Sequence, residues 1–370
     1  MKKEILIISA INIFEGGALS VLKDCLSELN NKEYFRFKII VLVHKKNLFF
    51  NGEFINLKFI EINDSRGFYI KRLYYEYFYF NNISRKFKPK FWFSFHDVTP
   101  ILTDTIQFVY CHNPSPFNHY NLKDIFLQPK QLIFNIFYKY VYGFNINKNK
   151  YVIVQQKWIK NKFIHYYNIN PRKIIISKPL INIPEIVKDK SNTNNDIKLF
   201  IFPAFPRPFK NIEIICKCAN ELINQGYINF KIILTFDGTE NIYSKYIFNK
   251  YKNNPNLIFT GSLPRSTIFE LYSKVDCMIF PSKLETWGMP LSEFLQYNKP
   301  ILVSNLPYAK ETIGSYDYVK YFNPDSTKEL IFCIKNILNG SIEFDKTSII
   351  NYPEPYAENW KQLFNLILLK

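Results

Sequence analysis

The chain has 370 residues, of which 47% are hydrophobic and 18% are aromatic. This composition can bury large apolar cores, which excludes an intrinsically disordered protein, and the length predicts two domains of roughly 150–200 residues. The six cysteines form no CxxC pair, which excludes a disulfide-rich or zinc-ribbon protein and favours a reducing compartment.

The formal net charge of +17 is concentrated in the first half of the chain. Residues 1–190 contain 29 Lys and Arg against 14 Asp and Glu, a net charge of +15, whereas residues 191–370 contain 19 against 17, or +2. Codon bias would raise the Lys content of both halves alike and is the alternative explanation. The asymmetry favours an anionic partner for the first half, either a membrane surface or a phosphate-bearing substrate.

Apolar runs and amphipathic segments alternate along the chain, as is typical of an α/β protein. We interpret Glu4–Ala10 as a buried first strand and not as a signal peptide, because Asn12 and Glu15 interrupt the apolar run. Further predicted strands in the first half are FKIIVLV, LKFIEI, FWFSF, IQFVYC and YVIVQ. No run predicts a membrane span, because polar residues interrupt the longest candidate, residues 131–147.

The pattern breaks at a polar, Asn-rich stretch, Lys188–Asp196, which predicts a linker. The alternation then restarts with IKLFIFPA and continues through FKIILTF, LIFTG, DCMIFPS and PILVSN. The sequence therefore predicts two Rossmann-like domains, residues 1–187 and 188–354, facing each other across a cleft, and a final helix within 355–370. Such domains bind ligands at the carboxyl ends of their strands, so candidate site residues should follow strands.

Two glutamates, Glu285 and Glu293, follow a predicted strand in the second half. The stretch between them predicts a helix start whose backbone amides favour anions or hydroxyls, and it contains Trp287, Gly288 and Met289. A carboxylate accepts two hydrogen bonds, which suits a vicinal diol such as a ribose. The alternative is that both glutamates are acidic side chains favoured near a helix N-terminus by the helix dipole alone. This alternative explains the Glu-x7-Glu spacing less well.

Arg207 and Lys210 share one predicted strand-to-helix loop. Arg supplies a fork of donors and Lys a point charge, so the two could hold a diphosphate and stabilise its charge as it leaves. A solvated basic loop is the alternative in this Lys-rich chain. Gly261 and Ser262 follow a later strand, and we expect them near the nucleotide base.

The first half offers weaker signals. Gly16 and Gly17 follow the first strand and would let the backbone approach a ligand closely, although a plain turn explains them equally well, and they form no GxGxxG fingerprint. His112 ends a strand and could contact the transferred group or move a proton. A loop histidine with structural contacts alone is the alternative. His96 and Asp97 form a similar but weaker case.

Taken together, these motifs resemble GT-B glycosyltransferases of the retaining family-4 type, the glycosyl transferases group 1. The resemblance is strongest over Leu199–Leu338, where a Gly, a helix ending in Tyr-Ser, an Asp before a strand, Pro-Ser and Glu-x7-Glu occur in the family's order. It implies that Glu293 holds the ribose of a nucleotide sugar and that Glu285 contacts the donor sugar. It also implies that Arg207 and Lys210 bind the diphosphate.

The resemblance further implies that Gly16 and Gly17 face the diphosphate and the acceptor, that His112 faces the sugar, and that the leaving phosphate takes the acceptor proton. No metal or other cofactor is then required, and no nucleic acid is expected as a partner. The basic first domain would bind a glycan or lipid-linked acceptor at the inner face of a bacterial membrane, with Tyr69–Phe93 as the candidate membrane segment. The expected function is hexosyl transfer in lipopolysaccharide or capsule synthesis, and the last helix should return to the first domain.

Two other classes of protein remain open from the sequence. A nucleotide-sugar epimerase of similar fold would lack the Glu-x7-Glu arrangement. A protein that binds anionic lipid or nucleic acid without catalysis would use the basic half and would show no turnover of any nucleotide sugar.

Overall fold

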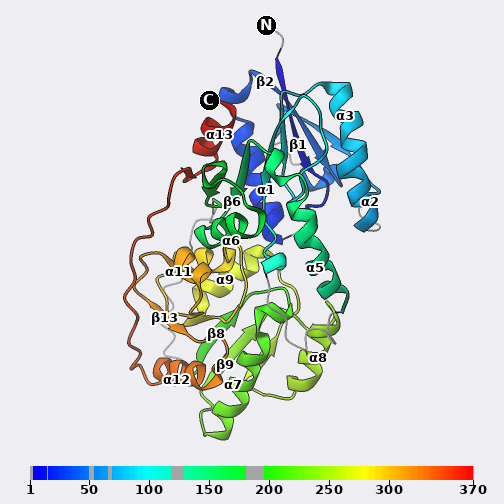
Figure 1. Ribbon diagram of the computed structural model, residues 1–370. Coiled ribbons are helices and arrows are strands. Elements are labelled where there is room, and N and C mark those ends of the chain that lie inside the picture. Colours follow the sequence, from blue (N-terminus) through cyan, green and yellow to red (C-terminus); the bar gives the residue numbers. More distant parts are fainter. Residues whose placement is uncertain are drawn as a thin grey trace. The chain divides into compact units, whose positions relative to one another are not determined.

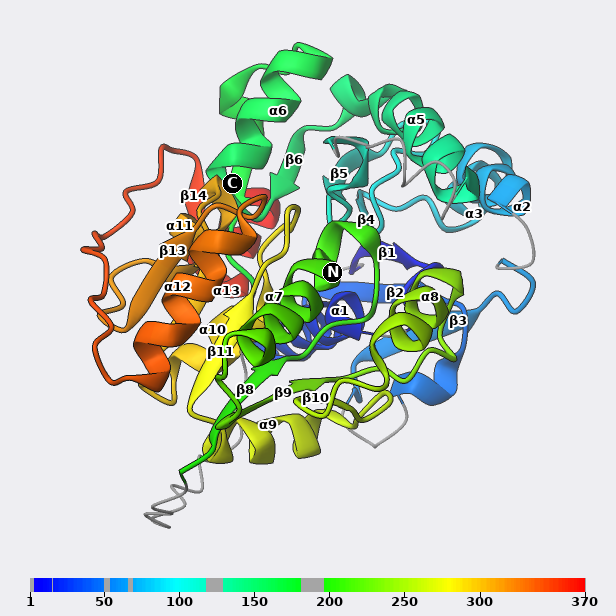
Figure 2. The same ribbon diagram turned by 90° about the horizontal axis from the view of Figure 1, so that it is seen from below.

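The computed structural model describes residues 3–14, 16–49, 54–65, 69–117, 129–180 and 196–369. The chain forms two compact units, each built around its own sheet (Figure 1, Figure 2). Unit 1 contains residues 1–117, 135–180 and 352–370, and unit 2 contains residues 118–134 and 181–351. In both sheets every described pair of neighbouring strands is parallel, which confirms the predicted α/β class with two Rossmann-like parts.

The sheet of unit 1 has eight strands in the order β14-β7-β6-β5-β4-β1-β2-β3. Its strands are β1 (Glu4–Ala10), β2 (Phe37–Val43), β3 (Leu57–Glu61), β4 (Phe91–Ser94), β5 (Ile106–Tyr110), β6 (Tyr151–Val154), β7 (Ile174–Ser177) and β14 (Tyr356–Ala357). The central strands are apolar on both faces, as a parallel sheet covered by helices requires. The strand order reverses between β1 and β4, which makes their carboxyl ends the place where such a sheet usually binds a ligand.

Helices cover this sheet on its two faces. They are α1 (Gly16–Leu29), α2 (Tyr69–Tyr74), a π-helical turn η3 (Tyr75–Tyr79), α3 (Phe80–Phe87), α5 (Pro129–Gly143), α6 (Lys157–Tyr167) and α13 (Trp360–Leu368). Short 3-10 helices are η1 (Lys32–Tyr34), η2 (Lys46–Phe49), η4 (Ser115–Phe117), η5 (Ile146–Lys148) and η6 (Pro171–Lys173). The first residues of α5 belong to unit 2 and the remainder to unit 1.

The last helix, α13, packs on the sheet of unit 1 beside α1 (Figure 1). It begins after Asn359, whose side chain accepts from the backbone N–H of Gln362 at 2.9 Å. The Trp360 ring lies 5.4 Å from the ring of Tyr110, and Phe364 lies 5.6 Å from Tyr34. The predicted return of the C-terminal helix to the first domain is therefore confirmed, and burial of its apolar face explains why it returns.

The sheet of unit 2 has six strands in the order β10-β9-β8-β11-β12-β13. Its strands are β8 (Lys198–Phe202), β9 (Phe230–Leu234), β10 (Leu257–Phe259), β11 (Cys277–Phe280), β12 (Ile301–Ser304) and β13 (Val319–Phe322). Its helices are α7 (Ile212–Asn224), α8 (Ile242–Tyr251), α9 (Arg265–Lys274), α10 (Met289–Leu295), α11 (Pro307–Ile313) and α12 (Thr327–Leu338), with a 3-10 turn η7 (Pro208–Lys210). This is the Rossmann strand order, and it reverses between β8 and β11.

The division into units differs from the predicted domain boundaries in part. The predicted boundary between residues 187 and 188 lies outside the described residues, as does the predicted linker up to Asn195. Unit 2 ends at Asn351, where the prediction placed the boundary between 354 and 355. Of the described residues, 129–134 belong to unit 2 although they lie within the predicted first domain, because a unit is defined by contacts in space and not by chain order. Among the described helices, none has the length and apolarity needed to cross a membrane.

Candidate functional site

The strongest candidate site in unit 2 lies where β8 and β11 run side by side, at the reversal of strand order (Figure 2). The chain leaves β8 through the turn η7, which carries Lys210, and leaves β11 through the loop that carries Glu285. The ammonium group of Lys210 donates to the Glu285 carboxylate. Their side chains are only 16% and 12% exposed. The structure therefore brings these two predicted site residues into direct contact.

Backbone contacts hold the two loops together. The N–H of Lys283 donates to the carbonyl of Phe209 at 2.7 Å. Asn211, in the left-handed conformation at φ 56°, donates from its side chain to the carbonyls of Pro281 at 3.3 Å and Pro324 at 2.8 Å. Asn tolerates this backbone conformation better than most residues. The position of Lys210 beside Glu285 is thus fixed by the fold of both loops and not by the ion pair alone.

Arg207 lies on the same loop as Lys210, and its backbone carbonyl accepts from the Lys210 N–H at 2.9 Å. Its guanidinium lies over the exposed ring of Phe205, 5.2 Å from the ring centre. The loop is anchored where the Asn241 side chain donates to the carbonyl of Pro206 at 2.8 Å. Two cations of one short segment are therefore held at the carboxyl end of β8, as the sequence predicts.

Glu293 lies in α10 and is 7% exposed. One carboxylate oxygen accepts from Nη2 and Nε of Arg265 at 2.8 and 3.1 Å, and the other lies 3.5 Å from the Tyr272 hydroxyl. Burial raises the pKa of Glu293, and Arg265 first and Tyr272 second oppose this shift. The sequence analysis noted Tyr272 only as part of the Tyr-Ser pair and did not single out Arg265, although their seven-residue spacing places both on one face of a helix.

Trp287, Gly288 and Met289 form the turn into α10. Gly288 has φ 83°, and a Cβ there would lie 3.3 Å from the Leu291 side chain, so a larger residue would strain this turn. The indole N–H of Trp287 donates to the Ser292 hydroxyl at 2.7 Å, and the Thr312 hydroxyl donates to the Trp287 carbonyl. These contacts fix the turn between the two glutamates.

Gly261 follows β10 at φ 72°. A Cβ at this position would lie 3.1 Å from a carboxylate oxygen of Asp237, which the sequence analysis did not single out. Hydrogen bonds from Thr239 lower the pKa of Asp237 and hold its carboxylate. Ser262 is exposed beside this approach. The glycine thus allows the loop after β9 to lie against the loop after β10.

In unit 1, Gly16 begins α1 at φ 66°, with open space where a Cβ would be, and Gly17 is exposed. His112 follows β5, and its Nε2 lies 2.9 Å from the carbonyl oxygen of Phe95. Because a carbonyl only accepts, Nε2 carries the hydrogen and Nδ1 is the acceptor of the neutral ring. Burial lowers the pKa of His112 to about 4, against the opposing effects of Asp97 and the Phe95 carbonyl. The ring is therefore neutral at physiological pH.

A buried polar network surrounds the carboxyl ends of β4 and β5. Asp97, at φ 75°, accepts from the His112 backbone N–H at 2.6 Å and from the hydroxyls of Tyr142 at 2.6 Å and Tyr138 at 3.1 Å. These contacts place His112 within the network. The two tyrosines come from α5, which is far from Asp97 in the sequence.

A second buried cluster lies beside it. His96 Nδ1 lies 2.8 Å from the Glu76 carboxylate, and Arg72 donates to the His96 carbonyl at 2.5 Å. Arg72 Nε lies 3.8 Å from the same carboxylate oxygen of Glu76. Only the His96–Asp97 pair was noted from the sequence, as a weak candidate. Arg72 and Glu76 had no local signal, because they meet His96 only in the folded unit.

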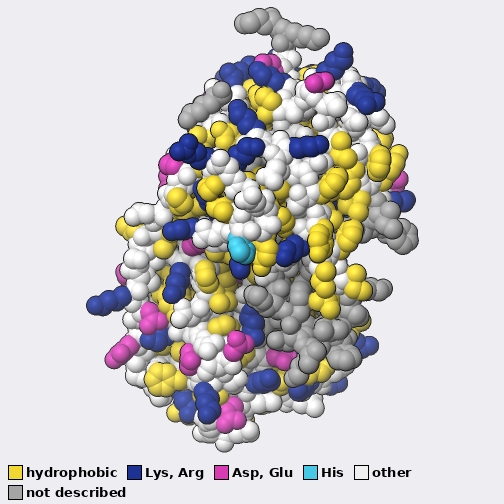
Figure 3. All heavy atoms as spheres, in the orientation of Figure 1, with side chains coloured by type: hydrophobic (Ala, Val, Ile, Leu, Met, Phe, Trp, Pro, Cys, Tyr) yellow, Lys and Arg dark blue, Asp and Glu magenta, His cyan; other side chains and the backbone are white. Residues whose placement is uncertain are grey.

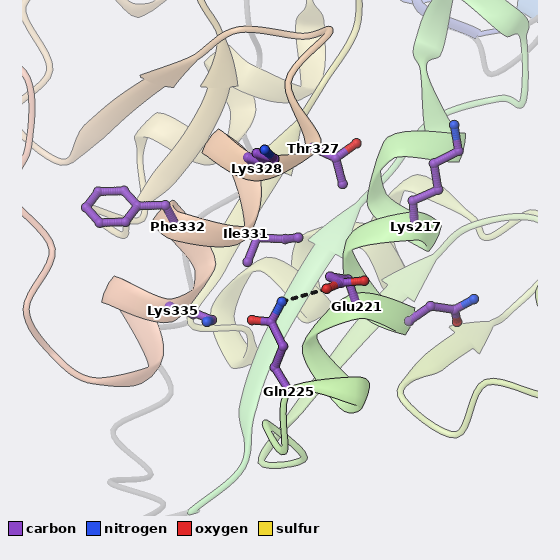
Figure 4. Close-up of a pocket in the computed structure, with 9 residues that line it drawn as sticks. Lys217, Glu221, Gln225, Thr327, Lys328, Ile331, Phe332 and Lys335 are labelled. Atoms are coloured by element: carbon purple, nitrogen blue, oxygen red, sulfur yellow. Dashed lines mark hydrogen bonds between the residues drawn. The ribbon is translucent and has the colours of Figure 1, made fainter.

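A pocket of about 720 Å³ lies elsewhere in unit 2, between α7 and α12 (Figure 4). Its lining includes Lys217, Lys328, Lys335, Ile331 and Phe332. None of the predicted site residues lines it. The described residues contain no group of three or more His, Cys, Asp or Glu side chains placed to hold a metal ion.

Two parallel α/β units with candidate residues at the carboxyl ends of their strands are what the predicted GT-B fold requires, and solved glycosyltransferase structures share this fold. Residues 184–347 match the family model described as glycosyl transferases group 1. The predicted family is therefore confirmed. The match favours a glycosyltransferase over the epimerase considered above.

The chain is 24% identical over 243 residues to the O-antigen chain mannosyltransferase RfbU of Salmonella typhimurium strain LT2. The match covers 65% of this chain but only 63% of that relative. A glycosyltransferase from Rickettsia africae has a similar structure, with a TM-score of 0.65 and 15% identity over 92% of this chain and 89% of that one. HepE of Anabaena, solved in complex with UDP-glucose, has a similar structure with a TM-score of 0.62. It is 14% identical, and the match covers 92% of this chain and 90% of that one. These structural likenesses establish the fold.

Proposed function

We propose that this chain transfers a hexose from a nucleotide-sugar donor to a glycan or lipid-linked acceptor, with retention of configuration and without a metal ion. The observation that carries the proposal is the contact of Lys210 with Glu285 at the carboxyl ends of β8 and β11, beside Arg207. Two cations and a carboxylate at the reversal of strand order suit a diphosphate joined to a sugar. Similarity to an O-antigen mannosyltransferase supports a role in lipopolysaccharide synthesis in a bacterium.

The proposed chemistry follows from these groups. Arg207 and Lys210 hold the diphosphate and stabilise the negative charge that develops as it leaves. Glu285 accepts hydrogen bonds from sugar hydroxyls, and Glu293 accepts from the ribose. The bond from the sugar carbon to the phosphate oxygen breaks on the face where the acceptor hydroxyl attacks, and the leaving phosphate oxygen takes the acceptor proton. The roles of Gly16, Gly17 and His112 toward the diphosphate, acceptor and sugar stay predictions from the family resemblance.

We also propose that unit 1 associates peripherally with the inner face of an anionic membrane. An aromatic face of unit 1 supports this proposal: its members are exposed by 50–72% and are Tyr74, Phe78, Phe137, Tyr140 and Phe144. Figure 3 shows hydrophobic side chains gathered along the flank that carries α2 and α5. Aromatic and aliphatic side chains beside Lys and Arg are typical of proteins that lie on anionic lipid. We therefore extend the proposed membrane surface from Tyr69–Phe93 to the exposed aromatic residues of α5.

A sedimentation assay tests the membrane proposal. We expect binding to vesicles that contain phosphatidylglycerol, weaker binding to pure phosphatidylcholine, and a decline with added salt. The double substitution Phe78→Ser and Tyr140→Ser should abolish binding without lowering thermal stability. Equal binding to both kinds of vesicle, or an unaffected double variant, would contradict the proposal.

The transfer proposal is tested first by thermal shift with UDP, GDP, CDP and ADP. A nucleotide at about 100 times its Kd should stabilise unit 2 by about 2.7 kcal/mol. The matching nucleotide sugar should then release nucleoside diphosphate slowly, and EDTA should not change the rate. Glu285→Gln should lower turnover by about 100-fold with little change in nucleotide affinity, whereas Glu293→Ala should mainly weaken nucleotide binding. Wild-type behaviour of both variants would remove the assignment.

A further inference from the structure

A buried carboxylate in unit 1 organises the loop that carries His112. Oδ1 of Asp97 accepts from the backbone N–H of His112 at 2.6 Å and from that of Asn113 at 3.2 Å. Two hydroxyls from α5 donate to the same carboxylate, that of Tyr142 to Oδ1 at 2.6 Å and that of Tyr138 to Oδ2 at 3.1 Å. An ionised carboxyl only accepts hydrogen bonds, so it satisfies all four donors, whereas a carboxamide would place its NH2 group against some of them.

The segment after β4 holds His112 at two points. Asp97 holds its backbone N–H, and the Phe95 carbonyl accepts from its ring Nε2 at 2.9 Å. Asp97 itself has φ 75°, a left-handed conformation that Asp tolerates better than most residues, and its N–H donates to the Tyr110 carbonyl at 3.2 Å. Because β4 and β5 are neighbouring strands, these contacts join the two loops at one edge of the sheet. His112 can turn neither its backbone nor its ring without breaking one of them.

This arrangement determines what the loop after β5 offers to a ligand. The backbone N–H groups of His112 and Asn113 donate to Asp97, so they are not available to an anion such as a phosphate. The ring carries its hydrogen on Nε2, so Nδ1 is an acceptor, and no described residue hydrogen-bonds to Nδ1. An acceptor of this kind suits a hydroxyl group, which sugars and glycans carry.

The inference rests on the proposed glycosyl transfer and on the predicted role of His112 toward the sugar. We propose that Asp97 is a positioning residue that acts on the reaction through His112. It fixes the backbone of the loop after β5, and thereby the place at which Nδ1 of His112 accepts from a substrate hydroxyl. Tyr138 and Tyr142 fix the carboxylate in turn. Nucleotide affinity should not depend on Asp97, because the acidic and basic residues proposed to hold the nucleotide lie in unit 2.

A double-mutant cycle on turnover tests this proposal. The assay measures release of nucleoside diphosphate from the nucleotide sugar that wild type hydrolyses fastest. Asp97→Asn should lower kcat by about 10- to 100-fold, as expected when a group at the reacting centre is misplaced, and should leave the Kd of the nucleoside diphosphate unchanged. His112→Gln should lower kcat at least as much. If Asp97 acts through His112, the double variant should fall no more than about threefold below His112→Gln alone, because the two losses share one contact.

Two further variants separate positioning from stability. Tyr142→Phe keeps the ring and removes one donor to the carboxylate, so it should lower kcat by about two- to tenfold. It replaces Asp97→Asn in the cycle if that variant does not fold. Thr99→Val is the matched control, because its fully buried hydroxyl, two residues after Asp97, accepts from the Asn149 side chain at 2.7 Å. It should lower thermal stability and keep the wild-type kcat.

Three results would overturn the inference. They are a wild-type kcat for Asp97→Asn, a wild-type kcat for His112→Gln, and a double variant whose loss is the product of the two single losses. A wild-type protein that releases nucleoside diphosphate from no nucleotide sugar would overturn the proposed function, and this inference with it. Circular dichroism and thermal unfolding of each variant show whether a lower kcat reflects misfolding.

Discussion

Units 1 and 2 both carry charged side chains at the carboxyl ends of their central strands, but they bury them differently. In unit 1, Glu76 is fully buried and Arg72 is 4% exposed. In unit 2, Lys210 keeps 16% and Arg265 42% of the side chain exposed. A charge that is closed off from solvent is available to its neighbours alone, whereas one at the surface of its unit can exchange its partner for a ligand. The same place in two similar sheets thus supports a structural network in one and a candidate binding site in the other.

The largest expected effect tests the structural half of this contrast. Glu76→Ala should lower the unfolding free energy of unit 1 by about 3–5 kcal/mol, because the buried Arg72 loses its carboxylate. Since the two units need not unfold together, calorimetry should be used to resolve their transitions. The transition of unit 1 should move to lower temperature and that of unit 2 should stay in place.

Glu285→Ala is the matched variant in unit 2. Because the Lys210 side chain retains some exposure, water can solvate its ammonium group once the carboxylate is gone. We therefore expect Glu285→Ala to lower the unfolding free energy less than Glu76→Ala does, and to lower turnover much more. Equal destabilisation by the two variants would break the contrast between the units.

The difference between the units also explains what the sequence could predict. The strands Glu4–Ala10 and Phe37–Val43 were predicted with the observed ends, because a buried parallel strand is an uninterrupted apolar run. Lys210, Glu285 and Glu293 could be proposed as candidate site residues because each follows a strand within one short segment. The contacts among them depend on which strands are neighbours, and the sequence pattern does not specify that order.

The network of unit 1 shows the limit more clearly. Glu76 lies in a π-helical turn, His96 after β4 and Tyr142 in α5. No periodicity relates positions so far apart, and the sequence alone does not distinguish a buried glutamate from an exposed one. The partner of Glu293 was missed for a similar reason, because Arg265 meets it only when α9 packs beside α10. Pairing of charges is a property of tertiary packing, which a single sequence does not reveal.

A smaller effect concerns His112 and the pH dependence of unit 1. The pKa of His112 in the folded state is about 4, which is below the unfolded value of about 6.5. The neutral ring therefore stabilises the fold above about pH 6.5, and this stabilisation is lost as pH falls toward 4, by up to about 1.4 kcal/mol per pH unit. Urea unfolding of wild type and His112→Gln at pH 7.5, 6 and 5 measures the effect. The two stabilities should converge on acidification, and parallel curves would show that the ring does not titrate as its burial implies.

The smallest effect is expected at the ion pair of Glu4 and Lys90, whose side chains are 44% and 49% exposed and whose atoms lie 2.5 Å apart. Distance alone would rank this pair above Arg72 with Glu76, which are 3.8 Å apart. A double-mutant cycle with Glu4→Ala and Lys90→Met should nevertheless give a coupling below about 1 kcal/mol, reduced further by salt, because water solvates both charges in either state. A coupling energy of Glu4 with Lys90 as large as that of Glu76 with Arg72 would mean that the distance between the charges determines the coupling energy. The expected ranking requires that exclusion of solvent determines it.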